Sequence, residues 1–335
     1  MTRLMRKFLS LASVLMAAWL ATPAARAQEG FDLRLFRPSV GVWFGGSPDV
    51  DFTPDPDSPP VEGQYGARSI GFGANFPLGL TGVHLDNEHL LAHQVLLGVT
   101  FATTDQTIDP LARAPRLYNG GITTTALFAT KAGNLYAGSL GASFAEDEDT
   151  IDDLKTRLFA LGLGTWRKSR TLAFVYGGAV TYLFGRESVL PAFGVLWNPS
   201  PNWFISGALP FSVRVSQHVS EKVRFNYLLY AAGQRYRFAN DGTFPGQDEV
   251  VFQRMRETHL GAEIEYRPSH DWAILGQAGI AGGRRLSFAD QGEEDFFDSK
   301  IDPAPYVKVG VRCLFGKTVL EDLGDQFMEK FGGKP

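Results

Sequence analysis

The sequence lacks the features that mark most other classes of protein. Its 335 residues include one cysteine, Cys313, which excludes an internal disulfide and a lipid anchor on a cysteine near the N-terminus. After residue 27, the longest mostly apolar stretch is residues 172–184, whereas a membrane-spanning helix needs about 20 residues. The motifs of serine hydrolases, zinc proteases, redox dithiols and phosphate-binding loops are also absent from the sequence. We therefore expect no catalytic residue, no cofactor and no enzyme activity.

Residues 1–27 have the pattern of a cleaved export signal. Three basic residues precede an apolar stretch over residues 8–20, and Ala25-Arg26-Ala27 is a small-residue cleavage site. A retained transmembrane helix is the alternative, which the shortness of the apolar stretch disfavours. Removing the four basic residues of the signal leaves 28 basic against 36 acidic residues, a net charge of −8. An acidic chain of this kind is not expected to bind nucleic acid.

The rest of the chain is rich in the residues of short β-strands. Aromatic residues make up 13% of the sequence and 37 residues are glycine. Fourteen segments rich in aromatic, β-branched and glycine residues are separated by turns or acidic loops, as in transmembrane β-barrels. The predicted segments are residues 35–44, 64–76, 90–103, 117–130, 135–144, 155–166, 171–184, 189–197, 203–209, 211–216, 223–238, 255–266, 272–288 and 306–315.

The connections between these segments alternate in length. Those after even-numbered segments are mostly tight, and those after odd-numbered segments include the long acidic ones, such as residues 45–63, 145–154 and 289–305. This alternation predicts an all-β fold, an up-and-down antiparallel transmembrane β-barrel over residues 28–315, with both termini in the periplasm and an even strand number. Three connections break the rule, which leaves twelve or sixteen strands as alternatives.

Two similar turns support the hairpin pattern. Residues 197–203 and 266–272 each place an aromatic residue before and after a Pro-Ser turn. Because amphipathic aromatic side chains gather at the membrane interface, we expect Trp166, Tyr136 and these turn aromatics to form a girdle at the periplasmic rim.

The C-terminal region predicts a final strand followed by a tail. In residues 306–315 apolar side chains alternate with Lys308, Gly310 and Arg312, and an alternating last strand that ends in phenylalanine resembles the signal read by the barrel-insertion machinery. In residues 316–335 apolar residues recur at helical spacing, which predicts a short amphipathic helix. We expect this periplasmic tail to pack on the rim, with a lumen plug or a partner-binding segment as alternatives.

Part of the chain resembles a known family. The motifs are Phe174-Val-Tyr-Gly-Gly-Ala-Val-Thr-Tyr-Leu-Phe-Gly185, Leu190-Pro-Ala-Phe-Gly-Val-Leu-Trp-Asn-Pro199, Trp203 and Leu209-Pro210. They are similar to those of bacterial outer-membrane β-barrels classed as a domain of unknown function. The resemblance covers a third of the chain and implies a fold and a location, the cell outer membrane, but no activity.

Two groups of residues could bind metal ions. His84, His89 and His93 surround the start of the third segment, but their spacing places the three on no common face, which favours a solvated turn over a zinc site. Acidic runs in residues 146–153 and 293–298 could bind calcium or bridge to lipopolysaccharide. Their spacing matches no defined calcium loop, so we interpret them as loops kept soluble by charge and predict no metal site.

The late segments carry charges that should face inward. Their neighbours one residue away are mostly apolar and should face lipid, so the charged side chains line either a closed polar network or a water-filled pathway. The predicted lumen-lining residues are Arg214, Arg224, Glu257, His259, Glu263, Glu265, Lys308 and Arg312.

Two functional hypotheses remain. The first is a passive narrow channel or small-molecule conduit, and the second is a structural or interaction barrel of the cell envelope that transports nothing. An outer-membrane phospholipase would need a serine and a histidine on the barrel exterior, whereas His259 should face inward. The expected partners are outer-membrane lipid and lipopolysaccharide. The segments at residues 171–184 and 189–197, apolar on both faces, leave an oligomer contact open.

Overall fold

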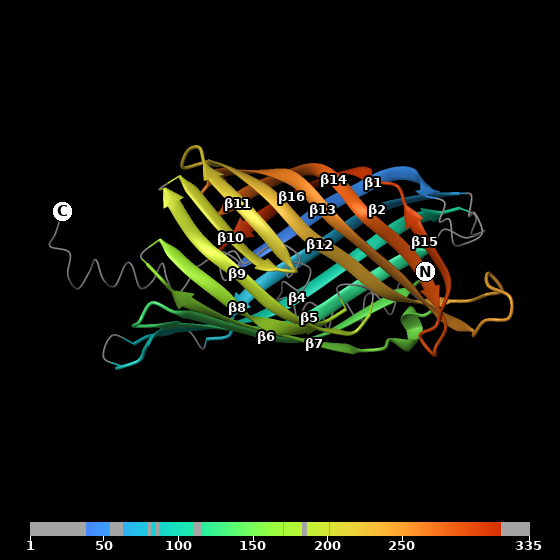
Figure 1. Ribbon diagram of the computed structural model, residues 1–335, viewed down its shortest axis with the longest axis horizontal. Coiled ribbons are helices and arrows are strands. Elements are labelled where there is room, and N and C mark those ends of the chain that lie inside the picture. Colours follow the sequence, from blue (N-terminus) through green and yellow to red (C-terminus); the bar gives the residue numbers. More distant parts are fainter. Residues whose placement is uncertain are drawn as a thin grey trace.

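The computed structural model describes residues 38–53, 63–79, 82–84, 87–109, 115–169, 171–182, 186–200 and 202–315. These residues form one closed antiparallel sheet, a barrel whose strands are tilted across its long axis (Figure 1). The sheet follows chain order, and β1 closes it against β16, with Val42 opposite Val311. The fold is the predicted all-β up-and-down barrel.

The barrel wall has fourteen strands, as predicted, which removes the alternatives of twelve and sixteen. β3 lies off the main path beside β4, and β15 and β16 run end to end between β14 and β1, so that together they form the last wall strand. The strands are β1 (Ser39–Thr53), β2 (Gln64–Pro77), β3 (Gly82–Val83), β4 (Leu90–Ile108), β5 (Arg116–Thr130), β6 (Leu135–Asp147), β7 (Arg157–Arg167), β8 (Leu172–Thr181), β9 (Ser188–Ser200), β10 (Trp203–Leu209), β11 (Ser212–His218), β12 (Val223–Ala239), β13 (Val250–Ser269), β14 (Trp272–Ala289), β15 (Asp295–Ile301) and β16 (Ala304–Leu314).

The predicted external loops were wrong in part. β1 continues to Thr53 inside the predicted loop at residues 45–63, and β15 lies inside the predicted loop at residues 289–305. The two extensions pair with each other, Phe52 opposite Ile301. Polar strand extensions beyond the membrane lack the alternation that marked the spanning parts. The predicted export signal (residues 1–27) and tail helix (residues 316–335) lie outside the described residues.

The outer face of the wall is apolar and exposed. In β16 the side chains of Val307 and Val309 are 59% and 52% exposed, whereas Tyr306 beside them is 5% exposed. A closed barrel leaves no unpaired sheet edge in the bilayer, and so large an exposed apolar surface suits lipid rather than water. The protein is an outer-membrane β-barrel. The exposed apolar face also includes Val42, Phe44, Ile70, Ile122, Leu140, Leu158, Phe174, Val189, Phe193, Leu260, Ile264, Ile274 and Ile280.

The short turns identify the periplasmic end, because barrels of this kind have short periplasmic turns and longer external loops. Tyr136, Trp166, Trp197, Tyr266 and Trp272 are exposed next to these turns, where an interfacial girdle is expected. Within the described residues, the structure contains no helix that is both long enough and apolar enough to span a membrane.

The wall strands differ greatly in length, which makes the external end of the barrel asymmetric. β10 and β11 have 7 residues each, whereas β12, β13 and β14 have 17, 20 and 18. Figure 1 shows β12, β13 and β14 running to the end opposite β10 and β11. The ladder between β11 and β12 stops at Ser212 opposite Tyr230, while β13 pairs with β12 as far as Ala239. Beyond Tyr230, β12 therefore keeps its ladder with β13, while β11 no longer covers its other edge.

A lysine at Val309 should test which face meets lipid. We expect Val309→Lys to lower the free energy of unfolding in lipid vesicles by about 2–4 kcal/mol, because a lysine near the bilayer centre must be desolvated. Thr107→Lys, on the same outer face near the external end of β4, should cost about 1 kcal/mol or less. Equal costs in urea titrations would place Val309 outside the hydrocarbon layer.

Candidate functional site

Towards the periplasmic end, the inner wall of β12 and β13 carries a row of buried polar side chains. Arg224 lies opposite Glu265, and Asn226 lies opposite Glu263. Asn226 donates from Nδ2 to Glu263 Oε1 at 2.7 Å and accepts from Ser216 Oγ at 2.6 Å. Arg224, Glu263 and Glu265 are each less than 8% exposed. These three charged side chains thus lie on one side of the lumen beside polar neighbours. Such neighbours offset the cost of removing a charged group from water at membrane depth.

Further along, the inner wall surrounds a cavity of about 230 Å³. Glu257 and His259 reach it from β13, Arg284 from β14 and Lys308 from β16. Glu257 accepts hydrogen bonds from His259 Nε2 at 2.7 Å and from Arg284 Nε at 3.2 Å.

The ring of His259 is fixed by its neighbours. It stacks on Tyr230 with ring centroids 4.8 Å apart, and Tyr306 meets it edge-on at 4.4 Å. A Cβ at Gly261 would lie 2.4 Å from Tyr306 Oη, so glycine there makes room for the tyrosine. His259 Nδ1 is buried and has no hydrogen-bond partner among the described residues. The cavity wall therefore includes an immobilised imidazole with one unused polar atom.

Arg284 reaches the cavity because of an irregularity in β14. The pairing of β13 with β14 shifts between Arg256, opposite Arg285, and Thr258, opposite Gly282. Gly283, within this shift, has a φ of +58° that favours glycine. The bulge reverses the alternation, so Arg284 is 3% exposed inside the barrel. Strict alternation from the inward Ala281 would have turned Arg284 outward.

Of the residues predicted to line the lumen, Glu257, His259 and Lys308 lie at the cavity, and Arg214, Arg224, Glu263 and Glu265 are buried. Glu257 contacts His259, and Lys308 places Nζ 4.8 Å from the ring centroid of Trp43. Arg214, on β11, and Arg312, opposite Ala273, lie nearer the periplasmic end and do not line the cavity. The sequence prediction missed Asn226, Gln277, Tyr230, Tyr306 and Arg284. The first four alternate on the same face as the predicted residues and could have been found.

The external mouth is occupied by an aromatic cluster. Phe238 and Phe288 are fully buried, with ring centroids 5.5 Å apart in an edge-on arrangement. Phe244 packs on Phe288 at 4.7 Å, and Phe297 packs on it at 5.7 Å. These side chains come from the external ends of β12, β14 and β15 and the connection after β12, and they narrow the barrel above the cavity.

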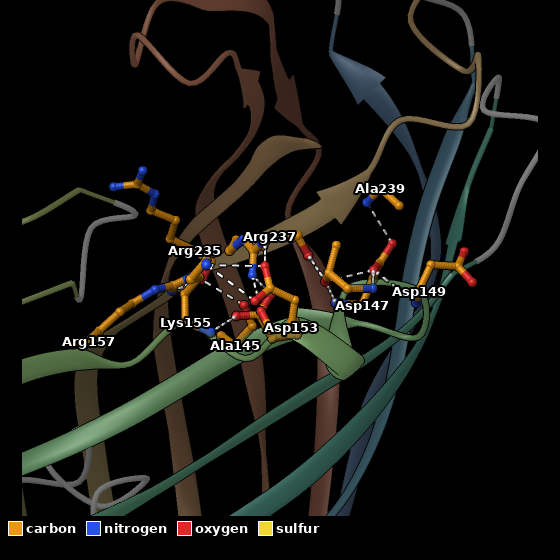
Figure 2. A network of polar contacts seen from close by, with 11 residues as sticks. Ala145, Asp147, Asp149, Asp153, Lys155, Arg157, Arg235, Arg237 and Ala239 are labelled. Atoms are coloured by element: carbon orange, nitrogen blue, oxygen red, sulfur yellow. Dashed lines mark hydrogen bonds and ion pairs between the residues drawn. The ribbon is translucent and has the colours of Figure 1, made fainter. Parts of the chain in front are cut away.

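The uncovered edge of β12 is held by the segment between β6 and β7 (Figure 2). We call these contacts the seam, made by residues 145–157 and 235–239. Arg157 Nη1 donates to the carbonyl oxygen of Arg235, and Thr150 Oγ1 donates to that of Arg237 at 3.2 Å. Asp147 Oδ2 accepts from the backbone N–H of Ala239 at 3.0 Å. Side chains thus satisfy the backbone groups that an edge strand would leave unpaired.

The seam also contains an ion-pair network. Arg237 Nη1 lies 3.2 Å from Glu146 Oε2, and Arg237 Nη2 lies 3.3 Å from Asp153 Oδ2. Hydrogen bonding to the Lys155 ammonium, with a smaller effect of Arg237, lowers the pKa of the Asp153 carboxyl. Glu146 and Asp147 are fully buried. The interpretation of this acidic run as a loop kept soluble by charge was therefore wrong for these two residues, because their carboxylates bind β12.

The structure places two of the three histidines of the predicted group together. β3 pairs with β4, Gly82 opposite His93, and brings His84 Nε2 to 2.8 Å from His93 Nδ1 with the rings stacked. The sequence prediction treated the three histidines as a solvated turn and did not include the short β3, which brings His84 beside His93. Within the described residues, no group of three or more His, Cys, Asp or Glu side chains could hold a metal ion.

Comparison with known proteins finds a family but no characterised relative. Residues 53–313 match the model of a family described as a domain of unknown function (DUF6268). No curated protein matches the chain.

Several solved structures are similar in fold. The COG4313 outer membrane channel from Pseudomonas putida F1 is 8% identical, with a TM-score of 0.46 over 88% of this chain and 99% of that chain. The translocator domain of autotransporter NalP from Neisseria meningitidis is 12% identical, with a TM-score of 0.35 over 83% and 88%. The outer membrane channel DcaP of Acinetobacter baumannii is 11% identical, with a TM-score of 0.23 over 83% and 96%.

Proposed function

The chain belongs to the family of the domain of unknown function (DUF6268), and from this premise we propose that it is a narrow passive conduit for small polar solutes across the outer membrane. The observation that carries the proposal is the polar inner wall of β12, β13, β14 and β16. It runs from Arg224 near the periplasmic end, through Glu263 and His259, to Arg284 beside the cavity. The proposal assigns no catalytic residue.

The chemistry of the wall suits a polar solute. Charged side chains at membrane depth are energetically costly unless they are paired or hydrated. A hydrated row of such side chains lowers the free-energy barrier to passage for a solute that can take the place of the water molecules. The cavity of about 230 Å³ has room for roughly seven water molecules at about 30 Å³ each, or for one small solute.

The aromatic cluster favours a second candidate. Phe238 and Phe288 are fully buried at the external mouth, as in a packed core rather than in the wall of a pore. A barrel filled in this way would serve as a structural or interaction protein of the envelope and would carry no current.

Planar-bilayer recording of the purified full chain separates the two candidates. We expect small, uniform conductance steps, and we expect the double substitution Glu263→Gln and Glu265→Gln to lower the cation-to-anion permeability ratio by about threefold, because two negative charges leave the wall. Glu294→Gln, in an exposed external connection, should leave the ratio unchanged. The absence of current from correctly folded protein would favour the structural barrel instead.

A further inference from the structure

A second cavity, of about 390 Å³, lies beside the seam at the external end. Its wall comes from β7, β12 and β13, from the segment before β7, and from the connections that follow β8 and β14. Four of its eight lining residues are cationic and none is acidic. The lining residues are Lys155, Arg157, Tyr182, Arg235, Arg237, Val250, Phe252 and Gln291.

Three carboxylates form ion pairs with cations of the cavity. Arg237 pairs with Glu146 and Asp153, Lys155 pairs with Asp153, and Arg235 pairs with Glu293 at 2.6 Å. Glu293 is also shared with Arg254 at 3.2 Å, so its charge is divided between two arginines. Among the described residues, these three carboxylates pair with the cations and a fourth, that of Glu187, accepts a hydrogen bond from the Tyr182 hydroxyl; all four lie outside the lining.

Arg157 is the cation of this cavity that forms no ion pair with a carboxylate among the described residues. Among the described residues its guanidinium donates to two carbonyl oxygens, those of Arg235 and Ala145, and to no carboxylate. Its guanidinium carbon also lies 5.7 Å from the ring centroid of Tyr182. Backbone hydrogen bonds therefore hold a guanidinium in place at the cavity without neutralising its charge.

Arg235 is fixed by an aromatic ring in addition to its ion pair with Glu293. Its guanidinium carbon lies 3.8 Å from the ring centroid of Phe252, and its Nε is buried with no hydrogen-bond partner in the described part of the chain. Two immobilised guanidinium groups at one cavity repel each other unless an anion lies between them. Planar guanidinium forks are suited to phosphate oxygens, which can accept several hydrogen bonds at once.

We propose that this basic cavity binds the phosphate group of an organic phosphate ester, carried either by a phosphorylated lipid headgroup or by a soluble molecule. Arg157, Arg235 and Lys155 receive the phosphate oxygens. Tyr182, Val250 and Phe252 supply an aromatic and apolar wall for the attached organic group. Binding here does not depend on conduction, so a barrel that carries no current would still bind the ligand.

Calorimetry and native mass spectrometry test the proposal on the full chain. Titration of the detergent-solubilised protein with inorganic phosphate and with glycerol 3-phosphate tests a soluble source. Native mass spectrometry after incubation with diphosphorylated lipid A, and with lipid A stripped of phosphate, tests a lipid source. Saturable binding of glycerol 3-phosphate assigns a soluble ligand, and retention of the phosphorylated lipid alone assigns a lipid headgroup. Binding of none of these phosphates overturns the proposal.

Substitutions locate the site. Arg157→Gln and Arg235→Gln should each weaken binding by about tenfold, as expected when a charge-assisted hydrogen bond is lost. Arg116→Gln is the matched control, because Arg116 also lies at the external end but pairs with the exposed Asp105 outside this cavity. If the double variant Arg157→Gln and Arg235→Gln bound the phosphate ligand as tightly as the unmodified protein does, the proposal would be overturned. Both arginines hold the seam together through their guanidinium groups, so Lys155→Gln gives a second test. The Lys155 side chain is 59% exposed and pairs with the exposed Asp153, so the barrel should still fold, and we expect binding to weaken by about threefold.

Discussion

Replacing Phe238 with alanine is expected to lower the free energy of unfolding by about 3–5 kcal/mol, the range for a fully buried phenylalanine. The side chain of Phe238 is completely buried, 5.5 Å from the ring of Phe288 and 6.5 Å from that of Phe244. Removing the ring creates a cavity that rigid β-strands cannot close. Urea titration of the protein in lipid vesicles, followed by tryptophan fluorescence, measures the loss.

The same variant connects stability to function. If the aromatic cluster narrows a conduit, Phe238→Ala should also raise the single-channel conductance, because the external mouth becomes wider. Leu154→Ala is the control, since this exposed side chain lies outside the strands and should change stability by about 0.5 kcal/mol or less. A Phe238→Ala barrel as stable as the control would show that the mouth is not packed as described.

Replacing Arg237 with alanine should weaken the seam by about 3 kcal/mol. Glu146, which is fully buried, would lose its ion-pair partner at 3.2 Å, and an uncompensated buried charge is costly. The edge of β12 would also be held less firmly, so we expect faster proteolysis between β6 and β7. Urea titration measures the stability loss, and limited proteolysis of the folded barrel measures the loosening.

Two further variants make this second prediction specific. Arg116→Ala breaks an ion pair whose side chains are both more than half exposed, and it should cost about 1 kcal/mol or less. The double variant Arg237→Ala and Glu146→Ala should lose less stability than the two single variants added together, because it removes the buried charge as well as its partner. Additive losses would mean that Arg237 and Glu146 do not interact.

The seam has a structural consequence for any path through the barrel. Because β10 and β11 are short, the external part of β12 meets β6 directly, with Arg237 opposite Glu146 in a single parallel pairing. The contact separates the aromatic mouth from the basic cavity beside β7. The proposed conduit and the proposed phosphate site therefore lie on different sides of β12 and can be tested independently.

The amino-acid sequence by itself determined the barrel. Spanning segments alternate between apolar and polar residues because one face of each strand meets lipid, and this local rule predicted all fourteen strands and the apolar outer face. Tight turns next to aromatic residues predicted which end is periplasmic.

Only the tertiary structure decided how the inside of the barrel is organised. The bulge at Gly282 and Gly283 turns Arg284 into the lumen, and alternation cannot reveal such a shift because one extra residue reverses every side chain after it. The pairing of Glu146 with Arg237 joins residues 91 positions apart, and it depends on the unequal lengths of strands that no local pattern encodes. An acidic run was therefore interpreted as a solvated loop, although closure of the barrel buries its first two carboxylates against the edge of β12.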